Sequence, residues 1–452
     1  MKFGGTSVES AQALERISGI VAGRLDRKPL VVVSAMGKTT DRLVAMARAI
    51  EVGDLAAALA ELNKMADHHL REALPAAADE RRAGLETFLK GTFEHMDKML
   101  RVYPLGQRLS AAETDLLLSF GERLSSTIVA EAFYRCGFHA VGLDSRTAIK
   151  TDASHGAAQL LVDETAAALA EHVVPHMEHS VVVMGGFIAS TVDGVTTTFG
   201  RGGSDYSAAI VGAALGAEEV QIWTDVDGVM TADPSLVADA HRLKIMSFGE
   251  ASELAYFGAR VLHPATMAPA LEKNIPIRVL NSRRPENEGT LIVVEAPQNA
   301  LVKSIAYKEG ITIVDVRSTR MLMAHGYLAR LFAAFERFKT SVDMVATSEV
   351  SVSLTVDRTD RLDEIIAELK GVADVERRDG NAIVCVVGDG IRYTPGVSAK
   401  IFSALDGILI EMVSVGASRR NISFVVDEND LEEVVRRLHK AFFSDVDKEV
   451  FA

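Results

Sequence analysis

The sequence has 452 residues, which is more than one ordinary hydrophobic core accommodates and predicts at least two domains. Hydrophobic residues make up 48% of it, which excludes wholesale disorder, and 62 acidic against 48 basic residues give a net charge of −14, which argues against nucleic acid or an anionic membrane as a partner. Cys136 and Cys385 offer neither a disulfide framework nor a zinc-type spacing. The opening residues lack an apolar signal segment, and no apolar run reaches the roughly 18 residues of a membrane span, so we expect a cytoplasmic protein.

Short valine-rich runs predict strands in the first two-thirds of the chain. Residues 30–34 (LVVVS) and 180–184 (SVVVM) are closed by proline or glycine, which is typical of strands buried on both faces of a parallel sheet. Helical patterns over 10–24 and 205–215 alternate with them and predict a layered α/β domain. Residues 51 to about 110 are rich in Ala, Leu, Glu and Lys, so we expect a helical excursion from the sheet, serving as a lid or a dimer contact.

An internal repeat follows a plausible linker at residues 296–299. LARLF at 328–332 returns as SAKIF at 398–402, and VSLTVD at 352–357 returns as ISFVVD at 422–427. Further pairs are 342–345 with 410–413 and 362–369 with 431–438. Each copy predicts a small βαββαβ unit, and two copies are expected to need each other to bury their sheets.

Two glycine-rich segments are candidate anion sites. In KFGGTS, Lys2 precedes a glycine pair and two hydroxyls, which fits either phosphate binding or an ordinary strand-to-helix turn. In FGRGGSDYS, Arg201 lies among three glycines, just before a helix of small residues. Ser204 or Asp205 could be a simple helix N-cap, but a cap leaves the glycines unexplained, whereas a backbone folded around an anion accounts for all of them.

Acidic residues in two segments have both a functional and an ordinary interpretation. Asp225 and Asp227 in WTDVDG follow a predicted strand, where nucleotide and metal sites lie in open α/β sheets, although an Asp-Gly turn also explains Asp227. Glu122 in SFGER lies near the start of an apparent helix, where a surface residue that complements the helix dipole is the simpler interpretation.

Taken together, these segments resemble aspartokinases of the amino acid kinase family over essentially the whole chain. The catalytic motifs are KFGGTSV at Lys2, VVVSAMGKTTDRL, SFGERLSS, FGRGGSDYSA, WTDVDGV, FGARVLHPAT and GTLI. TSEVSVSLTVD and TPGVSAKIFSAL match the paired ACT regulatory domains of that family. Their order and spacing make coincidence untenable.

The resemblance implies a fold and a domain plan. We expect an amino acid kinase fold over 1–295, with a mainly parallel sheet sandwiched by helices and the excursion at about 51–110. Two ferredoxin-like βαββαβ ACT domains, paired and interleaved, are expected over 300–452. The first would span about 311–375, and the second about 376–445 together with a strand near 301–308.

The resemblance also implies an activity and a set of site residues. The protein would phosphorylate the β-carboxylate of L-aspartate with ATP, and Mg²⁺ would be bound through the nucleotide phosphates with no protein metal site. The implied catalytic residues are Lys2, Asp205 and Arg260. The implied aspartate-binding residues are Ser34, Thr40, Glu122 for the ammonium group, Arg201 for the α-carboxylate, Gly202, Gly203 and Ser204. The implied ATP-binding residues are Lys2, Gly4, Gly5, Thr224, Asp225, Met230, Ser235, Arg260 and Val261.

Three positions depart from the family pattern on the nucleotide side. Met230 stands where the family often has Tyr, Ser235 where it often has Arg, and Arg260 where it has Lys. An arginine keeps the charge but replaces a point ammonium with a planar fork. Lys2 also comes unusually early, and a catalytic residue so near an end frays unless its backbone is tied into the sheet.

Regulation by an end-product amino acid is a further implication. The pattern favours lysine over threonine, and ACT pairs predict a homodimer or a dimer of dimers. The implied effector residues are Met321, Gly326, Tyr327, Leu328, Ser341, Val342, Asp343, Ser348 and Glu349, with Asp343 and Glu349 holding the ammonium groups of lysine. The ordinary interpretation of Asp343 and Glu349 is that they are turn residues at the ends of strands.

Two other functions remain open from the sequence. The departures at Met230, Ser235 and Arg260 would suit a catalytically weak amino-acid sensor that acts through its ACT pair. A sister kinase for another acidic substrate is the second alternative, although Arg201 and Glu122 favour a free amino acid.

Overall fold

The computed structural model describes residues 1–258, 264–297, 300–318 and 326–452. These fall into two compact units: unit 1 is Met1–Val229 with Val261–Val294, and unit 2 is Met230–Arg260 with Glu295–Ala452. The domain expected from the sequence over 1–295 differs from unit 1 in residues 230–260, which group with the C-terminal part. Across the four described stretches, no helix combines the length and the apolar character that a membrane span requires.

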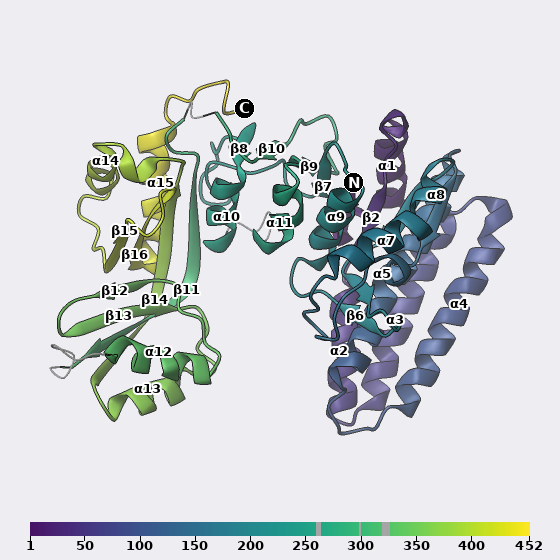
Figure 1. Ribbon diagram of the computed structural model, residues 1–452, viewed down its shortest axis with the longest axis horizontal. Coiled ribbons are helices and arrows are strands. Elements are labelled where there is room, and N and C mark those ends of the chain that lie inside the picture. Colours follow the sequence, from purple (N-terminus) through teal and green to yellow (C-terminus); the bar gives the residue numbers. More distant parts are fainter. Residues whose placement is uncertain (259–263, 298–299, 319–325) are drawn as a thin grey trace. The chain divides into compact units, whose positions relative to one another are not determined.

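A mainly parallel sheet forms the centre of unit 1 (Figure 1). Its strands lie in the order β3-β4-β2-β1-β7-β9-β10, and neighbouring strands run parallel except for β9 and β10. The two valine-rich runs form β2 and β4, and every residue of both strands is buried, as predicted. The bounds are β1 (Lys2–Phe3), β2 (Val31–Val33), β3 (Ala140–Leu143), β4 (Val181–Gly185), β7 (Val220–Thr224), β9 (Ile277–Asn281) and β10 (Thr290–Val293). A separate hairpin joins β5 (Ile188–Ser190) to β6 (Thr196–Thr198).

Helices cover both faces of this sheet because successive side chains of a strand point to opposite faces. Val181 and Val183 of β4 pack into one core with side chains of α1 to α5, whereas Val182 and Met184 pack into another with α6, α7 and α9. The helices of unit 1 are α1 (Ala11–Ala22), α2 (Thr39–Glu51), α3 (Leu55–Ala73), α4 (Asp79–Val102), α5 (Ala111–Arg135), α6 (Ser145–Ala148), α7 (Val162–His172), α8 (Val174–Met177), α9 (Gly203–Ala214) and α11 (Pro264–Glu272). Short 3₁₀ turns are η1 (Gly5–Ser7), η2 (Leu25–Arg27) and η3 (Leu74–Ala76).

The predicted helical excursion is the pair α3 and α4, joined by η3 (Figure 1). Asp54 is the N-cap of α3, and its side chain accepts a hydrogen bond from Ala57 N–H. Buried Leu89, Phe93 and Met96 on α4 recur at helical spacing and join the core shared with α2 and α5. The excursion therefore packs onto the sheet domain through one apolar stripe.

Unit 2 is built around a six-stranded sheet with the order β12-β13-β11-β14-β16-β15. Two 14-residue strands, β11 (Ser304–Arg317) and β14 (Asp374–Val387), pair with each other and run through both halves. β13 pairs with the second half of β11, whereas β16 pairs with the second half of β14. The remaining elements are β8 (Ile245–Ser247), α10 (Phe248–Tyr256), α12 (Tyr327–Arg337), β12 (Val345–Thr347), β13 (Ser351–Val356), α13 (Leu362–Lys370), η5 (Ile391–Tyr393), α14 (Val397–Ala404), β15 (Met412–Val415), β16 (Asn421–Asp427), η6 (Glu428–Asp430) and α15 (Leu431–Phe443).

The sequence repeat corresponds to this pseudo-symmetric sheet. α12, β12, β13 and α13 recur as α14, β15, β16 and α15, each set giving the helix-strand-strand-helix order expected. In the first copy Val314 and Val352 of the sheet pack against Leu331 of α12 and Ile365 of α13. Each copy borrows one half of a long strand, so neither sheet is complete without the other.

Candidate active site

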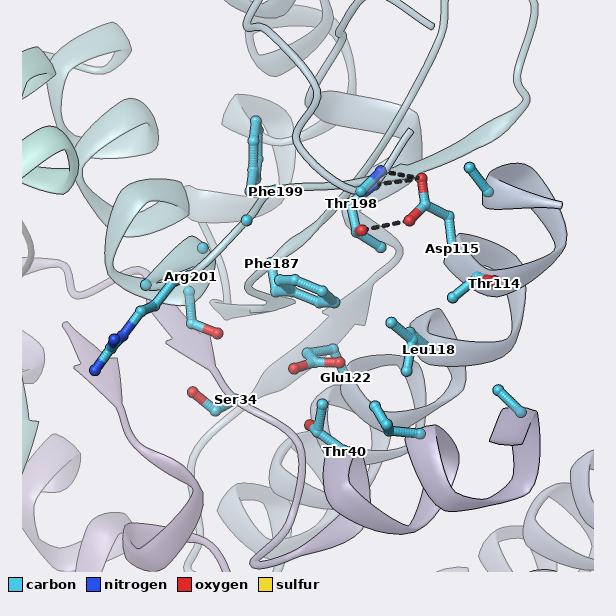
Figure 2. Close-up of a pocket in the computed structure, with 18 of the residues that line it drawn as sticks. Ser34, Thr40, Thr114, Asp115, Leu118, Glu122, Phe187, Thr198, Phe199 and Arg201 are labelled. Carbon is cyan, nitrogen blue, oxygen red and sulfur yellow. Dashed lines mark hydrogen bonds between the residues drawn. The ribbon is translucent and has the colours of Figure 1, made fainter. Parts of the chain in front are cut away.

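A cavity of unit 1 opens at the carboxyl ends of its parallel strands. It has a volume of about 920 Å³ and gathers side chains from β1, α2, α5 and the loop that leads into α9 (Figure 2). Nine residues that the sequence implicates line it: Lys2, Ser34, Thr40, Glu122, Arg201, Gly202, Gly203, Ser204 and Asp205. Segments from positions 2 to 205 therefore converge on one space, which is where ligands bind in open α/β sheets.

Lys2 is held in place although it is the second residue of the chain. Its strand lies between β2 and β7, with Lys2 in register with Val32 on one side and Ile222 on the other. The side chain is largely buried, and its Nζ lies 2.7 Å from Oδ1 of Asp205. This backbone pairing removes the fraying expected of a terminal residue, and the ion pair fixes the ammonium group at the cavity.

The glycine-rich loop ends as the N-terminus of α9. Gly202 is the N-cap, with φ of 76°, and no side chain caps this helix, so the N-cap interpretation of Ser204 or Asp205 is wrong. A Cβ on Gly203 would lie 2.7 Å from Cδ2 of Phe187, so a side chain has no room there. Two of the three glycines therefore have structural reasons, and the first turn of the 12-residue helix α9 lines the cavity, where a helix N-terminus favours an anion.

Glu122 differs from the sequence expectation of a surface residue near the start of a helix. It lies in the middle of α5 and is 3% exposed. Its Oε1 accepts a hydrogen bond of 3.2 Å from Ala35 N–H, while its Oε2 has no hydrogen-bond partner among the residues that the structure describes. Burial raises the pKa of the Glu122 carboxyl to about 8, and the bond from Ala35 opposes the shift. A buried acceptor left unsatisfied is an expected feature of a binding position.

Arg201 is a second cation in the cavity lining, besides Lys2. It is exposed, and it makes no hydrogen bond or ion pair with any other described residue, so its guanidinium can take up a ligand carboxylate. Ser34 directly follows β2, and Thr40 lies in the first turn of α2. Both lie below Glu122 in Figure 2. Ser34 is fixed by its backbone, since its N–H donates to Phe3 O and its carbonyl accepts from the Ser125 hydroxyl.

Sequence reasoning missed several lining residues, among them Asp115, Phe187 and Thr198. Phe187 has a φ of 65°, an uncommon conformation for a bulky residue, and the Ser207 hydroxyl accepts a hydrogen bond from its N–H. Its only sequence signal is the Gly185-Gly186 pair before it. Asp115 and Thr198 have no local signature, because the contact between them joins positions 83 residues apart.

Four residues predicted to bind nucleotide lie at the ends of β1 and β7, which are adjacent strands. Gly4 N–H donates to Trp223 O, and a Cβ on Gly5 would lie 2.9 Å from Ala35 O. Thr224 ends β7, and the exposed Asp225 accepts a hydrogen bond from its hydroxyl. Gly5 thus has a packing reason that does not require phosphate.

None of the other predicted nucleotide residues lies in the described part of unit 1. Met230 and Ser235 belong to unit 2, where the Met230 carbonyl accepts from the Ser304 hydroxyl and the Ser235 hydroxyl donates to Asp233. Arg260 and Val261 lie outside the described residues. Within the described stretches, no three His, Cys, Asp or Glu side chains gather as a metal site.

Most of the predicted effector residues lie in the first half of the regulatory sheet and around α12. Gly326 caps α12, which Tyr327 and Leu328 begin, and Met321 is outside the described residues. Ser341, Val342, Ser348 and Glu349 lie in the segments flanking β12.

Asp343 is the effector residue with the most distinctive surroundings. Its side chain is 4% exposed, and its Oδ1 lies 2.8 Å from Lys308 Nζ. Its Oδ2 is buried and has no hydrogen-bond partner within the described parts of the chain. Burial raises the pKa of this carboxyl, and Lys308 opposes the shift.

Comparisons with known proteins agree with this architecture. A sequence model of the amino acid kinase family matches residues 1–281, and an ACT domain model matches 384–442. Lysine-sensitive aspartokinase 3 of Escherichia coli is 35% identical over 98% of this chain and 98% of its own. Two crystal structures of E. coli aspartokinase III, one with aspartate and ADP and one with lysine and aspartate, each cover 98% of this chain and 99% of theirs, with TM-scores of 0.83 and 0.84.

Proposed function

Because this chain belongs to the amino acid kinase family, as an aspartokinase with C-terminal ACT domains, we propose that its cavity transfers the γ-phosphoryl group of ATP to the β-carboxylate of L-aspartate. The product would be 4-phospho-L-aspartate, at the first step of the aspartate-family amino acid pathway. One observation carries the assignment of the site: Lys2, Arg201 and an unsatisfied Glu122 line a single cavity.

The geometry suits a reaction between two anions. A carboxylate nucleophile is already ionised at neutral pH, so the site needs charge compensation and alignment instead of a strong base. Lys2, oriented by Asp205, would neutralise the transferring oxygens. Arg201 would hold the α-carboxylate and Glu122 the ammonium group, while Ser34, Thr40 and the α9 N-terminus complete the contacts.

The nucleotide would lie beside the ends of β1 and β7. Gly4, Gly5, Thr224 and Asp225 are placed there, and we propose that they contact ATP. Mg²⁺ would be carried by the nucleotide phosphates and water. The solved complex of the E. coli relative with aspartate and ADP supports both ligands. Met230, Ser235, Arg260 and Val261 remain proposed nucleotide contacts.

The direct test is ADP formation by the purified full chain with ATP and Mg²⁺. We expect turnover with L-aspartate and little with glutamate or N-acetylglutamate. N-acetylglutamate lacks the free ammonium group that Glu122 would hold, and glutamate carries its side-chain carboxylate one methylene further from the α-carbon. Turnover with N-acetylglutamate instead would favour the sister kinase. Lysine binding without turnover would favour the amino-acid sensor.

Glu122 gives the site a predicted pH dependence. Without ligand its carboxyl has a pKa of about 8, so it is mostly protonated at pH 7 and must ionise to hold the ammonium group. We expect kcat/KM for aspartate to rise as the pH increases from about 6.5 through 8, and the KM for ATP to stay nearly flat. Glu122→Gln should raise the KM for aspartate and abolish the rise. A Glu122→Gln profile that keeps the wild-type slope would contradict the role.

We further propose feedback inhibition by lysine at the first ACT unit. The crystal structure of the E. coli relative contains lysine together with aspartate, which supports a lysine effector. In this chain the buried Asp343 Oδ2 is available for an ammonium group, because Lys308 occupies only Oδ1. Gly326, Tyr327, Leu328, Ser341, Val342, Ser348 and Glu349 are the described residues proposed to surround it.

Asp343→Asn should raise the lysine concentration for half-inhibition by about 10-fold or more, because a charged hydrogen bond to the effector is lost. Asp357→Asn is the matched control: Asp357 pairs with the same Lys308 at 2.8 Å but lies outside the proposed site. Inhibition curves at fixed aspartate measure both variants. Equal shifts in the two variants would mean that the effect comes from releasing Lys308.

Several wider expectations follow from the family. We propose a homodimer or a dimer of dimers assembled through the ACT units, and domain limits near 295 and 300 as the sequence indicates. The cytoplasmic location stays a prediction.

A further inference from the structure

A second carboxylate on α5 lines the cavity, and no ligand role has been given to it. Asp115 is 1% exposed and lies near the start of the helix that carries Glu122. Figure 2 shows it turned toward Thr198 at one side of the cavity. A carboxylate buried this deeply is tolerated only when hydrogen bonds replace the lost water.

Four protein donors satisfy Asp115. Its Oδ2 accepts from Gly156 N–H at 3.0 Å, from Thr198 N–H at 3.2 Å and from His155 Nδ1 at 3.0 Å, while its Oδ1 accepts from the Thr198 hydroxyl at 2.5 Å. An ionised carboxylate offers about four acceptor sites, and this set engages both oxygens, with three donors on Oδ2 and one on Oδ1. Asp115 therefore differs from Glu122, whose Oε2 is unsatisfied in the described structure, and it has little capacity left for substrate.

Two of the donor residues, Thr198 and Gly156, lie next to the loop that bears Arg201. Thr198 ends β6 three residues before Arg201, and Ala158 N–H donates to its carbonyl. Gly156 lies beside the loop, since its carbonyl oxygen would be 3.8 Å from a Cβ placed on Gly200. Asp115 thus fixes the entry to the loop and the segment packed beside it.

Helix geometry links this anchor to the ammonium site. Asp115 and Glu122 are seven residues apart, which is about two turns and about 10 Å along one face of a helix. Both line the same cavity. The helix α5 therefore carries both Glu122, the proposed acceptor for the ammonium group, and Asp115, which anchors the loop that presents Arg201.

We propose that Asp115 is a positioning residue that sets Arg201 relative to Glu122, and so matches the site to the fixed separation of an α-carboxylate and an α-ammonium group. The inference rests on the proposed roles of Arg201 and Glu122. Asp115 acts through the loop and does not touch substrate.

The test is a double-mutant cycle on the full-length enzyme. Asp115→Ala should raise the KM for aspartate by about 10-fold or more, with the KM for ATP changed less than about twofold, because only the aspartate loop loses its anchor. In the Arg201→Ala background, Asp115→Ala should add less than about twofold, since the group it positions is already absent.

Asp115→Asn should recover most of the affinity, because an amide can accept from the backbone donors and donate to the Thr198 hydroxyl. Ser119→Ala, a buried α5 residue that does not line the cavity, is the control and should leave both KM values unchanged.

Each failure has a distinct signature. If Arg201→Ala raises the KM and Asp115→Ala adds its full effect on top, Asp115 acts independently and the inference is overturned while the proposed function stands. If Arg201→Ala alone leaves the KM unchanged, the proposed role of Arg201 fails and the inference falls with it. If Asp115→Ala does not fold, Thr198→Val should raise the KM for aspartate and Thr198→Ser should restore it, because only the hydroxyl donor differs. An unchanged KM in Thr198→Val would then overturn the inference.

Discussion

Lys2→Ala is expected to lower kcat by about 10²- to 10³-fold, with a much smaller change in the KM for aspartate, because the ammonium group stabilises charge that develops as the phosphoryl group moves. The structure supports a large effect: Nζ is held 2.7 Å from Asp205 at the cavity, so the cation is already in place before substrate binds. Steady-state kinetics with saturating ATP and Mg²⁺ provide the measurement.

Two matched variants sharpen the interpretation. Lys2→Arg keeps the charge but changes its shape, and it should retain more activity than Lys2→Ala. Lys98→Ala removes an exposed lysine of α4 that does not line the cavity, and it should leave kcat unchanged. A kcat of Lys2→Ala close to that of the unaltered enzyme would show that the charge of Lys2 is not used in the transfer.

Arg201→Ala is expected to raise the KM for aspartate by about 10- to 100-fold, because a bidentate charge-assisted pair with the α-carboxylate is lost. The kcat should fall less, since the α-carboxylate keeps its charge throughout the reaction and Arg201 binds ground state and transition state alike. Arg201 makes no hydrogen bond or ion pair in the described structure, so its removal leaves no buried charge uncompensated.

The aspartate α-amide provides the control for this prediction. That compound lacks the carboxylate that Arg201 is proposed to hold, so the unaltered enzyme should prefer aspartate strongly and Arg201→Ala should nearly lose the preference. Arg201→Lys should fall between the two, because a point charge cannot form the fork. Preserved discrimination in Arg201→Ala would place the α-carboxylate elsewhere.

The sequence predicted the sheet because its strands are locally marked. Runs of valine closed by glycine or proline became β2 and β4, buried throughout, and the repeat correctly indicated two related βαββαβ units. Patterns of this kind depend on neighbours in the chain, so single-sequence reasoning can find them. The interleaving through β11 and β14 depends on strand pairing over about 70 residues, and it came from the family resemblance.

The site residues with a local sequence pattern were predicted, whereas those that depend on contacts between distant parts of the chain were not. Lys2 and Arg201 lie in glycine-rich segments, which are a distinctive local pattern, and the structure brings both to one cavity. The ordinary interpretation of Glu122, a surface residue near the start of a helix, is wrong, because α5 begins at Ala111, eleven residues before Glu122, and the side chain is buried. Asp115 and Phe187 were missed, since the first acquires its partners only by folding and the second has no sequence signal beyond the glycine pair that precedes it.

The central claim concerns which carboxylate reacts: Arg201 and Glu122 hold the α-carboxylate and ammonium group, leaving the β-carboxylate free beside Lys2. Trapping the acyl phosphate with hydroxylamine tests this directly. We predict that the enzyme, ATP, Mg²⁺ and aspartate together yield aspartate β-hydroxamate, in amounts equal to the ADP formed. Formation of the α-hydroxamate, or of ADP without any hydroxamate, would contradict the account.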